Sequence, residues 1–157
     1  MVNLLAAAVL IAGTSPPPSC AAKMERLRYW ANAHEEVISE FLKDRTLTVY
    51  VVPDWKAFDS RDVAWTLPFD HPDVIWVRLD FLCVSSDSTL ELTISHECYH
   101  LVQPNWSHEQ IESSIRRSVG PKDYAGYRHE LELMLIAMEK WRDGHRPRRS
   151  WWKFGDP

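Results

Sequence analysis

Three side chains in the sequence stand at a spacing that suits metal chemistry: His96, Glu97 and His100, in a His-Glu-x-x-His pattern. On an α-helix, residues four apart lie one turn apart on the same face, so both imidazoles can bind one ion. Neutral imidazoles are frequent ligands of Zn²⁺, and a carboxylate beside them can take a proton from a water molecule that the metal polarises. The pattern therefore predicts a site for one Zn²⁺ ion, with His96 and His100 as ligands and Glu97 as general base. The alternative is a pair of ordinary helix histidines without a metal.

The residues around this pattern predict a helix that spans residues 88–103. Ser88 and Glu91 stand at the spacing of a capping box, and Pro104 marks the far end. On a helical wheel, three apolar residues fall away from His96: Ile94, Cys98 and Leu101. We therefore expect a helix with an apolar side toward the core and a metal-binding side toward a cleft.

With these residues the chain resembles the zincin metallopeptidases, and in particular their gluzincin branch, from the strand before His96 to the helix that ends near Trp141. The resemblance implies a zinc-dependent hydrolase, an endopeptidase that cleaves a peptide or protein substrate. It also implies a third zinc ligand from a glutamate on a later helix. The metzincin branch is less similar, because Trp106 stands where those proteins have their third histidine, and His108 comes two residues later.

The last predicted helix, residues 124–143, offers two glutamates for the third ligand, Glu130 and Glu132. They are about 200° apart on the helical wheel, so they cannot both face one metal ion. Glu130 interrupts an apolar stripe, where an unpaired carboxylate is costly, whereas Glu132 shares a polar face with Arg128. We therefore predict Glu130 as the third ligand. The alternatives are Glu132, or that both glutamates are surface charges.

In the predicted mechanism, water occupies the fourth position on the zinc, and Glu97 removes a proton from this water as it attacks the peptide carbonyl. Glu97 then passes the proton to the leaving amine. The oxyanion needs a further hydrogen-bond donor. Four residues are available, and the sequence does not distinguish them: His108, Tyr124, Tyr127 and His129.

The composition is that of a single globular domain. The chain has 157 residues, of which 45% are hydrophobic and 25% charged, which is enough for a modest core. Its net charge of −4 argues against a general nucleic-acid binder, which would usually be basic.

Three cysteines, Cys20, Cys83 and Cys98, are too few for a disulfide framework and show no Cys-x-x-Cys spacing. Cys83 and Cys98 fall within apolar patterns, so we expect both to be buried free thiols.

The first 22 residues resemble a secretory signal. Residues 2–12 are apolar except for Asn3, and small residues nearby suit cleavage after Ala21. The apolar run is too short to span a bilayer comfortably as a helix. We expect an exported protein (secreted, periplasmic or membrane-associated), with membrane contact through this N-terminal segment. The alternatives are a lipid anchor on Cys20, or a tail of a cytoplasmic protein.

The chain is thus divided into a signal or hydrophobic segment (1–22), a zincin-like metallopeptidase domain (23–145) and a basic, aromatic tail (146–157). Hydrophobic periodicity and turn residues predict the following elements: helix 23–43, strands 46–52, 63–67 and 74–84, and helices 88–103, 107–118 and 124–143. The predicted fold class is α+β, with an N-terminal helix, a short and mostly antiparallel sheet, the His-Glu-x-x-His helix and a C-terminal helix that carries the glutamate ligand. His34 is expected at the edge of the core.

By the resemblance, strand 74–84 is the candidate to line the cleft and pair with an extended substrate. An edge strand can do this, and a central strand cannot.

The sequence therefore predicts a monomeric zinc peptidase. One alternative is a catalytically inactive zincin-like binding or assembly protein, whose metal is structural or absent. Another is an exported, surface-associated module that acts through its basic, aromatic tail, residues 146–157.

Overall fold

Four strands and five helices form the part of the chain that the computed structural model describes, namely residues 9–33, 41, 43, 45–53 and 62–145. In chain order they are β1 (Val9–Gly13), α1 (Pro18–Ala33), β2 (Leu47–Val52), β3 (Ala64–Leu67), β4 (His71–Arg78), α3 (Leu79–Val84), α4 (Asp87–Val102), α5 (His108–Val119) and α6 (Pro121–His145). The α+β class is confirmed. His34 and the tail 146–157 lie outside the described residues.

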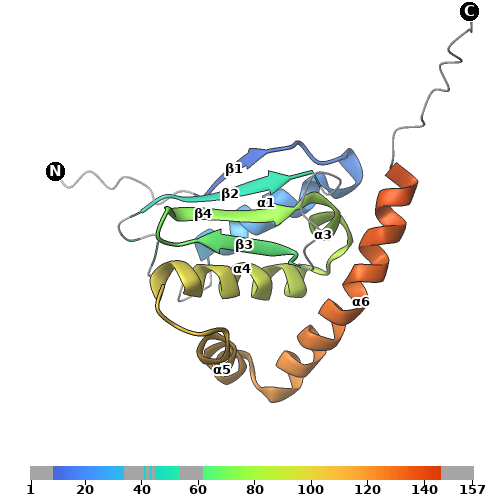
Figure 1. The fold of residues 1–157 in the computed structure, drawn as a ribbon. Helices are drawn as coiled ribbons and strands as arrows, with labels where there is room; N and C mark the ends of the chain where they lie inside the picture. Colours follow the sequence, from blue (N-terminus) through green and yellow to red (C-terminus); the bar gives the residue numbers. More distant parts are fainter. Residues whose placement is uncertain (1–8, 34–40, 42, 44, 54–61, 146–157) are drawn as a thin grey trace, which may run out of the picture.

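The strands form one mixed sheet in the order β1-β2-β4-β3 (Figure 1). The pairs β1–β2 and β2–β4 are parallel, and only β3–β4 is antiparallel. The prediction of a mostly antiparallel sheet is therefore wrong. The physical reason lies in the connections between the strands. After β1, helix α1 returns the chain to the end of the sheet where β1 began, so β2 can run parallel to β1. A short turn joins β3 to β4, so these two strands are antiparallel.

Strand β1 comes from the segment that resembles a secretory signal. Its last residue, Gly13, has a φ of 89°, and a Cβ atom there would lie 2.2 Å from the carbonyl oxygen of Val51. Only glycine tolerates this backbone conformation and this close approach to β2. None of the helices in the described ranges is long and apolar enough to cross a membrane.

Strand β4 ends earlier than predicted. The predicted strand 74–84 stops at Arg78, and Leu79–Val84 forms the short helix α3. Asp80 explains the change: its carboxylate is fully buried, accepts a hydrogen bond from the backbone N–H of Phe81, and forms a two-pronged ion pair with Arg78. A carboxylate that binds a first-turn N–H favours the start of a helix.

One face of the sheet carries the core. Alternate strand residues there pack against α1, α3, α4 and α6, and α4 lies along β3 (Figure 1). The buried members include Leu27, Leu47, Val49, Val51, Ile75, Val77, Phe81, Leu90, Ile94, Cys98, Met134 and Met138. The core therefore fixes α4 against the sheet, with its histidine-bearing half beside β3.

A disulfide between Cys20 and Cys83 joins the start of α1 to α3, with the two Cα atoms 5.1 Å apart. The prediction of a free thiol at Cys83 is wrong, because the fold brings residues 63 positions apart into contact. Cys98 is buried and forms no disulfide, as predicted. Beside the disulfide, the Lys23 ammonium donates hydrogen bonds to the carbonyl oxygens of Cys83 and Ser85, so α1 also holds the corner that precedes α4.

Candidate metal centre

Three histidines from two helices converge on one point. His96 and His100 lie one turn apart on α4, and His108 is the first residue of α5. Their candidate ligand nitrogens all lie within 4.8 Å of one another. These three residues could hold a metal ion, and the described part of the chain contains no other such group of histidine, cysteine or acidic residues.

The corner between α4 and α5 explains the position of His108. The backbone N–H of Trp106 donates to the carbonyl of Gln103, and the Trp106 ring stacks on Tyr99 with centroids 6.1 Å apart. Ser107 then begins α5 as its N-cap, in a capping box with Gln110. The tight corner therefore turns the chain back so that the first side chain of α5 faces α4.

The spacing of the nitrogens suits a small divalent cation. Nε2 of His96 lies 3.2 Å from Nδ1 of His108. Two imidazole nitrogens on one tetrahedral zinc, each about 2.0–2.1 Å from the ion, would be roughly 3.3 Å apart. The ring centroid of His100 lies 5.0 Å from that of His96 and 4.6 Å from that of His108. Three nitrogen ligands leave a fourth position free, which is the arrangement of catalytic zinc sites rather than closed structural ones.

The environment favours the neutral form of His96 and His100, the form that binds a metal. Burial, together with the neighbouring His100 and His108 rings, lowers the pKa of His96 to about 3. Burial and the His108 ring also lower the pKa of His100. Neutral imidazoles carry the free lone pair that binds a metal ion, so protons compete weakly for this site near neutral pH.

Glu97 follows His96 on α4, and its side chain is buried. Burial raises its pKa to about 7, and a hydrogen bond from the Thr66 hydroxyl, at 3.4 Å, acts in the opposite direction. Thr66 belongs to β3, which is an edge strand of the sheet. Glu97 therefore lies where the histidine-bearing helix meets an edge strand. A cation held by the histidines would favour the charged form of this carboxylate.

Glu130 lies elsewhere, and the structure does not bring it to the histidines. It accepts hydrogen bonds from the backbone N–H of Ser86 at 3.1 Å, from the Ser86 hydroxyl at 2.9 Å and from the Thr89 hydroxyl. Ser86 is the N-cap of α4, whereas His96 and His100 lie in the C-terminal half of that helix. The physical reason is that a carboxylate is stabilised by the orphan N–H groups and partial positive charge of a helix N-terminus. Glu132 is exposed on α6.

The structure also separates the residues that were considered for the oxyanion. His129 is exposed, and His108 belongs to the histidine cluster. The Tyr127 side chain is buried, with its hydroxyl 3.3 Å from that of Thr93, one turn before Glu97 on α4. Burial raises the pKa of Tyr127 to about 12, so the hydroxyl keeps its proton and remains a donor; the nearby Glu97 charge adds to this effect.

Sequence reasoning considered His108 only as an oxyanion donor. The spacing of His108 from His100 in the sequence matches no metzincin pattern. The position of the His108 side chain in space depends on the corner between α4 and α5. A usable signal was present: His108 follows the Ser107 N-cap directly, and only a short turn separates that cap from α4.

No protein-family model matches the chain, and no curated protein or solved structure matches it either. The zincin resemblance thus stays a prediction, and the three-histidine cluster is what the structure adds to it.

Proposed function

We propose that the chain is a zinc-dependent peptidase, an endopeptidase in which Glu97 is the general base. One observation supports this most directly: Glu97 follows His96 of the three-histidine cluster on α4, is buried, and is contacted by Thr66 of an edge strand. A base that neighbours a candidate metal ligand and contacts an edge strand suits metal-assisted hydrolysis of an extended peptide.

Strand β3 is the strand suited to bind the substrate. The predicted strand 74–84 corresponds to β4, which is central between β2 and β3 and so cannot pair with a further chain. Among the described strands, β3 pairs with β4 alone, so its other edge can offer backbone N–H and C=O groups to a peptide. A peptide paired there would pass over Thr66 and the carboxylate of Glu97.

The roles of the residues follow from their positions. His96, His100 and His108 would hold the ion, and a bound Zn²⁺ would polarise both a water molecule and the scissile carbonyl. Glu97 takes the proton from the attacking water and then delivers it to the leaving amine. Tyr127 contributes a protonated hydroxyl near Glu97, on the side of α4 that faces α6.

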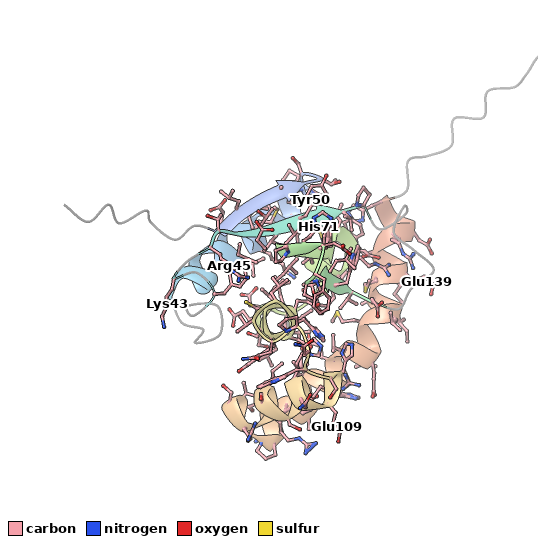
Figure 2. The ribbon with its side chains drawn as sticks, turned by 60° about the vertical axis from the view of Figure 1, so that its left-hand side comes forward. Lys43, Arg45, Tyr50, His71, Glu109 and Glu139 are labelled. Carbon is pink, nitrogen blue, oxygen red and sulfur yellow. A yellow bond between two sulfur atoms is a disulfide. The ribbon has the colours of Figure 1, made fainter. Side chains whose placement is uncertain are left out.

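The test is hydrolysis of a protein or peptide-library substrate by the zinc-loaded chain and by Glu97→Gln. We expect Glu97→Gln to keep near-stoichiometric zinc, because the histidines are intact, while its kcat falls by at least about a hundredfold. Glu109→Gln is the matched control: it changes an exposed glutamate next to His108 and should keep both zinc and activity (Figure 2).

If zinc binds and Glu97→Gln is as active as the unchanged chain, the proposed chemistry is wrong. If zinc binds and neither protein hydrolyses any substrate, the chain is better described as the alternative, a metal-binding protein without catalysis. Absence of stoichiometric zinc, copper, iron or manganese from the unchanged chain would remove the basis of both.

We also propose that the protein works in an oxidising compartment outside the cytoplasm. The supporting observation is the Cys20–Cys83 disulfide, since disulfides persist mainly in exported proteins. Cleavage after Ala21 would remove Cys20 and β1, so an exported chain with this fold must retain both.

A further inference from the structure

One end of the sheet exposes an apolar surface. Because strand side chains alternate between faces, the neighbours of the buried Val49, Ile75 and Ala64 point away from the core. Most of these outward residues are apolar or aromatic, with the polar Thr48 between Leu10 and Val74: Leu10, Tyr50, Val74, Trp76, Trp65 and Leu67. Tyr50 and Trp65 both pair with Trp76 in the sheet register, and the two tryptophan rings stack at 6.4 Å. Figure 2 shows Tyr50 and His71 on the side of the molecule away from α5.

The turn between β3 and β4 extends this surface outward. Phe69 is 76% exposed and Leu67 46% exposed, with Pro68 between them. The turn is held by a hydrogen bond from the backbone N–H of Asp70 to the carbonyl of Leu67. An ordered turn that presents a phenylalanine and a leucine to solvent is unusual in a surface that contacts only water.

The N-terminal segment enters the sheet at the same end. Val9 pairs with Leu47, and Thr48 with Val74, so the starts of β1, β2 and β4 lie together beside the β3–β4 turn (Figure 1). The eight residues before β1 are uncharged and, apart from Asn3, apolar. Leu10, which follows them, is 53% exposed. Two segments distant in the sequence therefore bring apolar side chains to one end of the molecule.

We propose that the β3–β4 turn, through Leu67 and Phe69, docks this end of the protein on the surface of a phospholipid membrane. Leu67 and Phe69 protrude on one narrow turn, which is too small for the roughly 800 Å² per partner of a stable protein interface, so a second copy would also have to cover the sheet residues behind the turn. A lipid interface accepts a protruding apolar turn, and it favours tryptophan and tyrosine just behind the inserted residues, where Trp65, Trp76 and Tyr50 lie.

The charges near the turn select the type of lipid. Asp70 and Asp73 flank the turn, so an anionic surface would repel it, and the attraction must come from apolar burial in a zwitterionic membrane. Leu67 follows Thr66, whose hydroxyl contacts Glu97, so docking would hold strand β3 at the lipid surface. The docking proposal does not depend on the proposed peptidase activity.

The test is co-sedimentation of the full chain with phosphatidylcholine vesicles. The double variant Leu67→Ser, Phe69→Ser should reduce the partition coefficient by about tenfold or more, because two apolar side chains no longer enter the lipid. The matched control is Leu133→Ser, Ile136→Ser, which changes two similarly exposed apolar residues on α6 and should leave binding within about twofold. Binding should also change little between low and high salt.

Three results would overturn the proposal. One is an unchanged chain that does not bind the vesicles. Another is equal binding by the turn variant, which would assign any lipid contact to another segment, such as residues 1–8. The third is a dimer of the unchanged chain in solution that the turn variant converts to monomer, which would make this surface an interface between copies. Circular dichroism of both variants checks that their fold is intact.

Discussion

Nε2 of His96 lies 3.2 Å from Nδ1 of His108, although the two residues are twelve positions apart and on different helices. Two neutral ring nitrogens at this distance either share a proton in a hydrogen bond or bind one cation together. His100 completes the group from the next turn of α4. The three histidines could therefore hold an ion without Glu130, which instead accepts hydrogen bonds at the N-terminus of α4.

The first prediction is that His108→Ala weakens metal binding and Glu130→Ala does not. Removing one of three ligands should raise the dissociation constant for Zn²⁺ by on the order of a hundredfold or more, since even loss of a supporting group costs 10–100-fold. Metal analysis after dialysis and competition with a chromophoric chelator measure this. His129→Ala, an exposed histidine on α6, is the control.

The two variants separate the gluzincin-like ligand set from the three histidines that could hold an ion. Metal loss in Glu130→Ala with retention in His108→Ala would contradict the structure and restore the ligand predicted from the sequence.

Local signals in the sequence predicted α4 and α5 well, because these signals depend on neighbours in the chain, whereas α3 was predicted as part of a strand. The Ser107–Gln110 capping box places the start of α5 correctly, and apolar periodicity finds α4 within one residue at each end. The N-cap of α4 is Ser86 rather than Ser88. The Ser86 hydroxyl donates a hydrogen bond to Glu130 of α6, so even the start of this helix involves a contact with a distant residue.

The relations between elements could not be predicted in the same way. Residues 9–13 belong to an apolar run with no period that distinguishes a strand from a secretory signal, so the parallel sheet was missed. Glu130 was recognised as a carboxylate on an apolar stripe that needs a partner, but the sequence does not reveal that the partner is a helix N-terminus. His108 joins the site through a corner whose direction is set by packing.

The second prediction concerns this capping role. Glu130→Gln should lower the free energy of unfolding by about 1 kcal/mol near neutral pH, because the N-terminus of α4 loses a negative charge and strong acceptors. Partial burial raises the pKa of Glu130, but hydrogen bonds from Thr89 and Ser86 and the nearby Lys23 outweigh it and leave the pKa below its ordinary value of 4.5.

The pH dependence follows from that direction. A lowered pKa in the folded state means that the stabilisation is present above the unfolded-state pKa and is lost as the pH falls through the folded-state pKa. Urea unfolding of both proteins should therefore show a difference at pH 7 that shrinks below about pH 4. A difference that grows as the pH falls would contradict this role.

The third prediction is that Cys20 and Cys83 form a bond in the native protein and Cys98 does not. Peptide mapping without reduction should recover Cys20 linked to Cys83, and Cys98 should react with alkylating reagents only after unfolding, because it is buried. Replacing both bridged cysteines by serine should lower the free energy of unfolding by about 4 kcal/mol, from the loop-closure entropy of a loop of this length. Reduction of the unchanged chain should have the same effect, and a Cys83 that is alkylated in the native protein would exclude the bond.

The last prediction concerns Tyr127. Its hydroxyl lies 3.3 Å from that of Thr93, and the charge of Glu97 is close enough to raise the pKa of Tyr127. If the chain is a peptidase, a protonated donor in this position can stabilise charge that develops on the substrate carbonyl, and Tyr127→Phe should lower kcat by about 10–1,000-fold with little change in KM. Zinc content should stay the same, because Tyr127 is not among the candidate ligands.

The control for this prediction is Tyr124→Phe. Tyr124 is a neighbouring buried tyrosine, and its ring centroid lies 6.0 Å from that of Tyr127. Removing its hydroxyl therefore tests for a general disturbance of the α5–α6 packing. Equal losses in both variants would reduce Tyr127 to a packing residue, whereas a loss in Tyr127→Phe alone assigns its hydroxyl to the reaction.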